Sequence, residues 1–326
     1  MARINMVQAI NLAMDEMMAE DQSVVVLGED VGVDGGVFRA TEGLFAKYGE
    51  QRVIDTPLAE SAIIGTAIGM AMGGLKPVGE MQFSGFSYLM IPQLEGHGSR
   101  MRARTMGQFS VPMVMRLPYG GGVRALEHHS ESREVFYAHM PGVKVVIPSG
   151  PRNARALLRA AILDPDPVVF MEPKRSYRAF KEDVPDAPET MEIGKCQVVQ
   201  EGTDITVVAW GAMMHTARKA VAEIEKARGT SIELIDLLTV APMDSDTIAA
   251  SVRKTGRLAV IQEAPRSFGA ASEIIASIND KALMFLEAPA KRVTGYDVVT
   301  PYFGRELNYI PTVGRARRGI EEALDF

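Results

Sequence analysis

A single carboxylate, Glu60, stands at the start of a long apolar segment, where its type and position are suited to chemistry. From Ser61 to Leu75 the chain is rich in Ala, Gly, Ile and Met, a composition typical of a helix buried on both faces. Glu60 is therefore expected at the wall of an interior site. A buried carboxylate needs a partner, which we expect to be an arginine, a helix N-terminus or a bound ligand. The structural alternative is that Asp55 and Glu60 together cap a core helix.

Two adjacent histidines, His128 and His129, follow the glycine-rich sequence GGGVR. A histidine in such a loop can donate a hydrogen bond or carry a proton near neutral pH. No metal-ligand spacing such as H-E-x-x-H accompanies the pair, so a structural role is the alternative. In extended chain the two side chains are expected to point in different directions. The remaining histidines look structural or superficial: His97, His139 and His215.

The glycine-rich stretch Gly28–Phe38 follows a predicted strand, where a dinucleotide-binding fingerprint is usually sought. Its glycines, at positions 28, 32, 35 and 36, do not give G-x-G-x-x-G, and the chain has no P-loop pattern. We therefore expect a βα turn that needs positive φ rather than a nucleotide site. Glu29 and Asp30 can still face a cleft, because ligands of such sheets bind beyond the carboxyl ends of the strands.

Length and composition are those of a globular protein with room for two domains. The chain has 326 residues, of which 47% are hydrophobic and 23% charged, enough for two proper cores. A net charge of -6 argues against a nucleic-acid partner, since phosphate binding needs a positive surface. The basic clusters Arg100–Arg104 and Arg315–Arg318 are expected to be solvated or interface faces.

The one cysteine, Cys196, excludes an intramolecular disulfide and a cysteine-based metal site, and it fits a reducing, cytoplasmic location. Residues 1–18 predict an amphipathic helix rather than a secretory signal. The longest apolar run, Ala62–Leu75, has 14 residues, whereas crossing a bilayer takes about 20. We expect no membrane partner, and we expect Gly65 and Gly69 to mark close packing between helices of the core.

Short β-branched runs alternate with helix-like stretches, which predicts an α/β fold with parallel sheets covered by helices on both faces. Strands this continuously apolar are buried on both sides. In the first part of the chain the predicted strands are 24–27, 77–83, 113–116, 143–147 and 168–171, and the predicted helices lie near 6–19, 60–74, 87–104 and 151–163.

The segment from Glu172 to Lys195 is polar, contains three prolines and shows no period, so we interpret it as a linker. The alternation then resumes, with predicted strands 205–210, 232–237 and 258–263 and helices near 213–227, 244–253 and 268–278. The sequence therefore predicts two doubly wound domains, which we place at residues 1–185 and 186–326.

Several segments, taken in their order and spacing, resemble the beta subunit of the thiamine-diphosphate-dependent decarboxylase component of 2-oxoacid dehydrogenase complexes. They are DTPLAE, GEMQFSGF, GGGVRALEHHSES and HMPGVKVVIPSGP. The resemblance extends from MVQAINLAMDEMM and VVVLGEDVG near the start to IPTVGRARRGIEEAL near the end. It implies a pyrimidine-binding thiamine-diphosphate domain followed by a smaller domain similar to the C-terminal domain of transketolase.

The resemblance also implies roles for individual residues. Glu60 matches the glutamate that hydrogen-bonds the aminopyrimidine of the cofactor and so promotes the carbanion that attacks a 2-oxoacid. Phe86 matches the aromatic residue that stacks on this ring, and Leu58 and Gln82 fall where cofactor-lining residues lie. His129 matches the active-site histidine that contacts substrate or intermediate, and His128 is the lesser candidate.

Residues 160–167, AAILDPDP, resemble a monovalent-cation site, suited to potassium, that is built mainly from main-chain oxygens. It would involve Met113, Ala161, Ile162, Asp164 and Asp166. Asparagine is more common at the last of these positions, so Asp166 departs from the family pattern. The alternative is an ordinary loop between helix and strand, broken by two prolines.

The diphosphate-and-magnesium motif of thiamine enzymes, Gly-Asp-Gly followed by a later Asn, has no match in the chain. Magnesium needs such oxygen ligands to bridge the phosphates. By the family pattern this half of the site belongs to an alpha subunit, which implies an α2β2 heterotetramer with the complete site between unlike subunits. Further implied partners are a dihydrolipoyl acyltransferase core with its lipoyl domain and a small 2-oxoacid.

Two other classes of protein compete with this interpretation. A flavoprotein or nucleotide-binding module would explain two α/β domains but lacks the glycine fingerprint and leaves Glu60 unexplained. An inactive scaffold is opposed by the presence of Glu60, Phe86 and His129. The substrate stays open between pyruvate and branched-chain 2-oxoacids: the SGFSY context is similar to pyruvate-type relatives, and EPKRSYR and GYDVVTPY are similar to branched-chain types.

Overall fold

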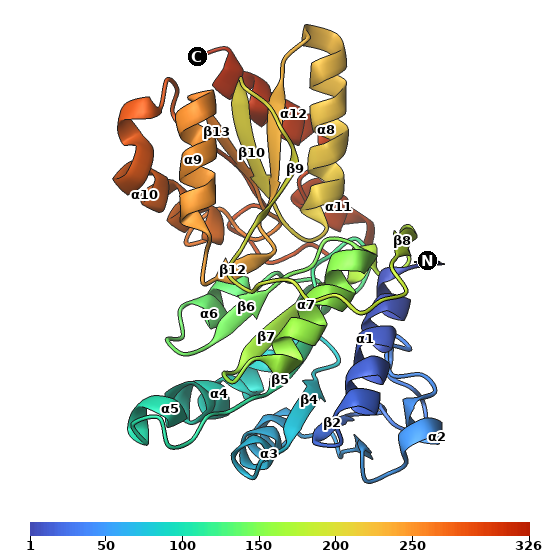
Figure 1. The fold of residues 1–326 in the computed structure, drawn as a ribbon. Coiled ribbons are helices and arrows are strands. Elements are labelled where there is room, and N and C mark those ends of the chain that lie inside the picture. The colour runs from blue at the N-terminus through green and yellow to red at the C-terminus, as the bar shows by residue number, and fades with distance from the viewer. The chain divides into compact units, whose positions relative to one another are not determined.

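The computed structural model describes residues 1–326 and divides into two compact units (Figure 1). The first unit comprises Met1–Tyr119 and Phe136–Ile193, and the second comprises Gly120–Val135 and Gly194–Phe326. Each unit is built around a sheet in which parallel pairs of strands predominate. The predicted α/β class is confirmed.

The sheet of the first unit runs in the order β6-β7-β5-β4-β2-β3, and every neighbouring pair in this order is parallel. Its strands are β2 (Val24–Gly28), β3 (Val53–Asp55), β4 (Lys76–Glu80), β5 (Val114–Tyr119), β6 (Lys144–Val146) and β7 (Val168–Pro173). All residues of β2, β5 and β7 are buried. This burial explains why these strands read as continuous apolar runs rather than as alternating patterns.

Helices α1 (Met6–Glu20) and α7 (Pro151–Leu163) pack against each other in the first unit. Asn5 opens α1 with a capping box, in which its side chain accepts from the Gln8 N–H and the Gln8 side chain accepts from the Asn5 N–H. Glu16 of α1 pairs with Arg155 and Arg159 of α7. These ion pairs therefore link α1 to α7.

The remaining elements of this unit are short, apart from α3, which faces β2 and β4. They are β1 (Ala2–Ile4), α2 (Leu44–Tyr48), α3 (Glu60–Met72), η1 (Ser84–Leu89), α4 (Ile91–Gly96), η2 (Gly98–Arg100), α5 (Met101–Arg104), α6 (Glu134–Ala138), which starts at the end of the segment 120–135, η4 (Lys174–Ser176) and β8 (Glu182–Val184).

The single helix predicted near 87–104 is instead a series of short turns, η1, α4, η2 and α5. Gly96 and Gly98 interrupt it, since glycine weakens a helix interior. A Cβ at Gly98 would make only ordinary van der Waals contact, at 3.4 Å, with the side chains of Ile68 and Leu94, so packing does not require a glycine there. Apolar periodicity alone did not reveal this interruption.

Helix α3 is buried on one face only, whereas its composition predicted burial on both. Ile63, Ile64, Ala67 and Ile68 are buried, but the face that contains Ala62, Thr66 and Gly69 is exposed. A Cβ at Gly65 or Gly69 would meet nothing within 4 Å, so the predicted close helix packing at these glycines is wrong for this chain. Small residues expose little apolar area, so leaving this face in contact with solvent costs little free energy.

The sheet of the second unit has the order β14-β13-β10-β11-β9. Strands β10 (Ile205–Ala209), β11 (Ile232–Asp236), β13 (Leu258–Ile261) and β14 (Lys291–Val293) are parallel, and the edge strand β9 (Gln197–Gln200) is antiparallel to β11. The helices are α8 (Met213–Arg228), α9 (Ser245–Thr255), α10 (Ala270–Ala282), α11 (Glu306–Tyr309) and α12 (Val313–Leu324), joined by the short elements η3 (Glu127–His129), β12 (Thr239–Ala241), η5 (Leu283–Phe285) and η6 (Phe303–Arg305).

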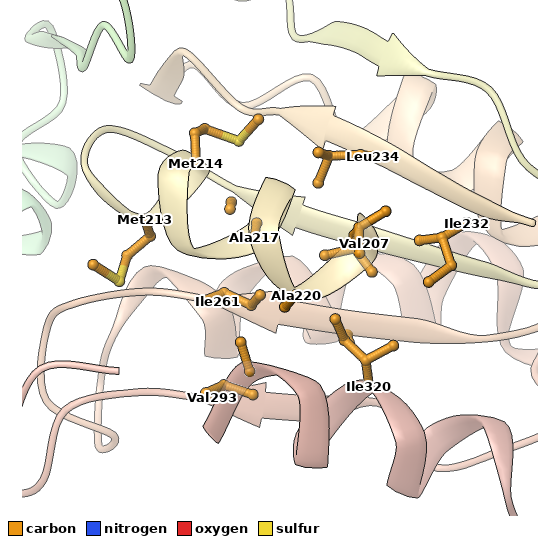
Figure 2. Packing of buried hydrophobic residues seen from close by; sticks show 14 of the residues in the cluster. Val207, Met213, Met214, Ala217, Ala220, Ile232, Leu234, Ile261, Val293 and Ile320 are labelled. Carbon is orange, nitrogen blue, oxygen red and sulfur yellow. The ribbon is translucent and has the colours of Figure 1, made fainter. Parts of the chain in front are cut away.

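The core of the second unit lies between its sheet and the helices α8 and α12 (Figure 2). Val207 and Ile261 project from the sheet toward Ala217 and Ala220 of α8 and Ile320 of α12, and all five side chains are fully buried. The small alanines of α8 let the helix approach the strands closely, as dense core packing requires. This core needs no residue of the first unit.

The division between the units differs in two ways from the predicted domains 1–185 and 186–326. Residues beyond 185 still belong to the first unit, where Asp186 pairs with the N-terminal ammonium of Met1 at 2.7 Å and Glu189 pairs with Arg152 at 2.9 Å. The division along the chain falls at Ile193 and Gly194. In addition, the segment 120–135 belongs to the second unit, and no local sequence pattern predicts this. No helix combines the length and apolar character needed to cross a bilayer.

Candidate functional site

Five of the predicted or suspected site residues of the first unit follow the carboxyl ends of three adjacent parallel strands. Glu29 and Asp30 follow β2, Glu60 lies on the segment after β3, and Gln82 and Phe86 follow β4. Because β3, β2 and β4 are neighbours in the sheet, these residues gather at one edge. That edge is where doubly wound sheets bind their ligands.

Glu60 is the first residue of α3 and is only 6% exposed. Neither a hydrogen bond nor an ion pair joins its carboxylate to another side chain of the molecule. Of the partners expected from the sequence, the structure supplies the helix N-terminus, whose dipole favours a negative charge. The buried carboxylate therefore retains its capacity to bind a ligand group.

The alternative in which Asp55 and Glu60 cap α3 is wrong. The N-cap residue is Ala59, which makes no side-chain cap. Asp55 instead accepts hydrogen bonds from the main-chain N–H groups of Gly32 at 2.6 Å and Val33 at 3.2 Å. Asp55 thus shapes the glycine-rich loop after β2, and Glu60 is left for another role.

Several acidic groups meet at this edge of the sheet. Burial raises the pKa of Glu29, and the neighbouring carboxylates of Glu60 and Asp30 raise it further. Asp30 accepts a hydrogen bond from the Gln82 amide at 2.9 Å. A concentration of negative charge favours a ligand group that donates hydrogen bonds or carries positive charge.

An aromatic surface completes this edge. Phe86, on η1, is half-buried and meets Phe83 edge to face, with ring centroids 6.0 Å apart. Phe38 in turn contacts Phe83 at 5.4 Å. Leu58, just before α3, is 79% exposed and so is available to cover a ligand. Acids beside aromatic and aliphatic side chains suit a planar heteroaromatic ring with N–H donors.

A buried charge network joins β4, β5 and β7, and no local sequence pattern predicted it. The Arg116 guanidinium donates to Glu80 at 2.6 Å and to the two oxygens of Glu172 at 2.7 and 3.0 Å. Tyr177 also donates to Glu172 at 2.5 Å. Burial raises the pKa of Glu80, but each charge has a partner, and removing one would leave the others unpaired in the interior. The detectable signal was a single charged residue within each of the otherwise apolar strands β5 and β7.

The glycine-rich loop after β2 has the backbone that the sequence predicted. Gly35 and Gly36 adopt φ values of 71° and 79°, in the left-handed region that favours glycine. The N–H of Gly36 donates to the carbonyl of Asp30 at 2.7 Å. The loop is a tight turn that holds Asp30 at the sheet edge.

His128 and His129 lie on the short helix η3 of the second unit, so the expectation of extended chain is wrong there. Their rings are close, with centroids 4.3 Å apart and a tilt of 37°. His128 Nδ1 lies 3.6 Å from the Glu127 carboxylate, and both histidines are half-buried. The structure thus gathers Glu60, Leu58, Gln82 and Phe86 in the first unit and places His129 in the second.

The segment proposed for a monovalent cation has its carboxylates already paired. Asp164 pairs with Lys144 at 2.6 Å, and Asp166 pairs with Arg102 at 2.6 Å. Pairing of β5 with β7 brings Met113 beside this segment, where its carbonyl accepts from the Val168 N–H at 2.9 Å. The predicted cation would rely on main-chain oxygens, including those of Ala161 and Ile162, although the Ala161 carbonyl also accepts from the Asp164 N–H at 3.3 Å. The site stays a prediction. No group of three or more His, Cys, Asp or Glu side chains could hold a metal ion.

Fold and site together define a class of protein: a two-domain α/β chain of the transketolase type, whose first domain offers acids and an aromatic surface at its strand ends. The family model "Transketolase, pyrimidine binding domain" matches residues 2–179, and "Transketolase, C-terminal domain" matches residues 194–312. A solved "Split gene transketolase, inactive beta4 tetramer" has the same fold, with a TM-score of 0.81 over 99% of both chains and 21% identity.

Closer relatives narrow the class to a family. The "Pyruvate dehydrogenase E1 component subunit beta" of Acholeplasma laidlawii is 54% identical over 95% of both chains. The proteins of that name from Bacillus subtilis (strain 168) and Staphylococcus aureus (strain N315) are 48% and 46% identical over the full length of each chain. The chain belongs to the family of beta subunits of the thiamine-dependent E1 component of 2-oxoacid dehydrogenases.

Proposed function

We propose that this chain is the beta subunit of an E1 component that acts on pyruvate, decarboxylating it and passing the acetyl group to a lipoyl domain of an acyltransferase core. The observation that carries the proposal is Glu60, a buried carboxylate without a partner in the chain, at the strand ends where a ligand binds. The names of the full-length relatives support pyruvate rather than a branched-chain 2-oxoacid as the substrate.

The residues at the sheet edge fit the pyrimidine half of thiamine diphosphate. The carboxyl group of Glu60 would share a proton with a ring nitrogen, and Phe86 would lie against the ring face. Leu58 and Gln82 would line the same ring, with Gln82 oriented by its bond to Asp30. When bound, thiamine diphosphate supplies the carbanion that attacks the carbonyl carbon of a 2-oxoacid. His129 would contact the substrate and donate or accept a proton there.

We assign the other half of the site to an alpha subunit, in an α2β2 heterotetramer. The motif that would hold the diphosphate and magnesium has no match in this sequence, and magnesium favours carboxylate and phosphate oxygens. Potassium at the main-chain oxygens around Met113 and Ala161 belongs to the same proposal. A cytoplasmic location also stays a prediction.

The substrate proposal is tested by co-expressing the chain with a candidate alpha subunit and measuring 2-oxoacid turnover. We expect pyruvate to exceed 3-methyl-2-oxobutanoate in kcat/KM by at least about tenfold, since each extra methylene in a fitted pocket is worth a factor of roughly 10 to 200. The purified beta chain without its partner serves as the blank. Equal or better use of 3-methyl-2-oxobutanoate would assign the chain to the branched-chain enzymes.

A further inference from the structure

Two buried carboxylates of the second unit hold the main chain of the loop that leads to His129. The N–H of Gly121 donates to Glu263 Oε1 at 2.5 Å, and the N–H of Arg124 donates to Glu306 Oε1 at 2.6 Å. Glu263 lies just after β13, and Glu306 is the first residue of α11. The loop 120–131 is therefore attached to two separate elements of the unit.

Both carboxylates are far from solvent, with exposures of 5% for Glu263 and 0% for Glu306. The second oxygen of Glu306 has no hydrogen-bond partner, so the bond to Arg124 is how this side chain compensates for its burial. Hydrogen bonds to an ionised acceptor are short and strong, more so at low dielectric. The carboxylates of Glu263 and Glu306 are the two anchors of the loop, and we expect their hydrogen bonds to hold its backbone in place.

The loop backbone approaches the carboxylates too closely for side chains. Gly120 has a φ of 80°, and a Cβ there would lie 2.9 Å from Glu263 Oε1. A Cβ at Gly121 would lie 3.2 Å from the second oxygen of Glu306 and 3.0 Å from Ile310. Gly120 and Gly121 of GGGVR therefore allow the close contact between the loop backbone and these two residues.

The other end of the loop is tied back to its start. The N–H of Gly120 donates to the carbonyl of Glu131 at 3.0 Å. Within the loop, the N–H of His129 and the hydroxyl of Ser130 both donate to the carbonyl of Leu126, at 3.1 and 3.0 Å. The loop is thus closed on itself and bonded to two buried carboxylates. A shift of either carboxylate is therefore expected to move His129, which lies within the closed loop.

A third acid, Glu134, lies within the electrostatic reach of Glu263. Burial raises the pKa of Glu134 to about 7, and the charge of Glu263 contributes to this shift. Neither oxygen of Glu134 has a hydrogen bond of good geometry, although the Trp210 side chain interacts with it weakly. In contrast, Glu263 accepts the main-chain bond from the loop. Of these two acids, only Glu263 holds the loop by a hydrogen bond, and Glu134 does not.

We propose that Glu263 and Glu306 are positioning residues that set the place of His129 in the reaction. The proposal rests on the proposed function, because it assumes that His129 contacts the substrate. It gives the second domain a part in the chemistry, through the two carboxylates that bind the loop. Displacement of a reacting group by about 1 Å can lower a rate roughly 10²-fold.

The test uses the assembled alpha–beta enzyme with Glu263→Ala and Glu306→Ala, each beside its Gln variant, whose amide oxygen can still accept the bond. We expect the Ala variants to lose about 10-fold to 100-fold in kcat, with unchanged affinity for thiamine diphosphate. The Gln variants should recover most of this loss. Amide hydrogen exchange of residues 120–131 should accelerate in the Ala variants and stay near wild type in the Gln variants.

Glu233→Ala is the matched control, since Glu233 is also buried in this unit and accepts a glycine N–H, that of Gly202, at 3.2 Å. It should lower stability without changing kcat. Wild-type kcat in both Ala variants, an equal loss in the control, or unchanged exchange of 120–131 would overturn the proposal. If the wild-type enzyme turns over no 2-oxoacid, the proposed function fails by itself, and exchange of the loop still decides whether the two carboxylates anchor it.

Discussion

Replacing Glu60 with glutamine is expected to abolish most cofactor activation while leaving the fold intact. Glutamine keeps the size and shape of the side chain, but its amide is a poor proton donor to a ring nitrogen. Exchange of the thiazolium proton in the assembled enzyme should slow by roughly 10² to 10⁴, the range for a positioned acid–base group. Quenched-flow NMR measures this exchange directly.

The same variant should melt close to the wild-type temperature. Glu60 is buried without an ion pair, and removing an unpaired buried charge costs little stability. Glu273→Gln is a suitable control, because Glu273 lies in the first turn of α10 and is exposed, so it tests the loss of a helix-terminal charge alone. Wild-type exchange in Glu60→Gln, or a large drop in melting temperature with normal chemistry, would return Glu60 to a structural role.

Replacing His129 with alanine is expected to impair turnover by about 10² to 10³, the cost of losing one positioned donor or acid–base group. Binding of thiamine diphosphate should be unchanged, because the residues that fit the pyrimidine ring lie in the first unit and His129 in the second. Steady-state kinetics with calorimetry of cofactor binding separates the two effects.

His128→Ala is the matched control for this variant. Its ring lies beside that of His129, with centroids 4.3 Å apart, but its Nδ1 faces Glu127. We expect a much smaller loss of turnover. An equal loss of turnover in His128→Ala and His129→Ala would mean that the two histidines act as a pair. Wild-type turnover in both variants would mean that the loop has only a structural role.

The regular part of the fold could be predicted because buried parallel strands and their helices leave a strong local signal. Helices α1 and α7 and strands β2 and β10 lie within one or two residues of their predicted ranges. The break around Gly96 and Gly98 was not predicted, because an isolated glycine inside an apolar periodic run weakens a helix without always ending it. Likewise, the place of residues 120–135 in the second unit depends on bonds to distant Glu263 and Glu306.

Some residues of the candidate site could likewise be predicted from local sequence patterns, and others could not. Glu60 and the histidine pair stood out because a carboxylate before an apolar run and histidines after glycines are local patterns. The buried network of Arg116 could not be predicted, since its partners Glu80 and Glu172 lie 36 and 56 positions away in the sequence. The roles of Phe86, Gln82 and Leu58 came only from the family resemblance, because single aromatic or aliphatic residues carry no chemical signature.

The most direct test of the whole account is calorimetric titration of thiamine diphosphate with magnesium into three samples: this chain, a candidate alpha subunit, and the two co-expressed. We expect binding in the low micromolar range, a free energy near -8 kcal/mol, for the assembled pair only. We also expect this chain alone to bind thiamine diphosphate at least about 100-fold more weakly, because it holds only the pyrimidine half of the site. Micromolar binding by this chain without a partner would contradict the division of the site between two subunits.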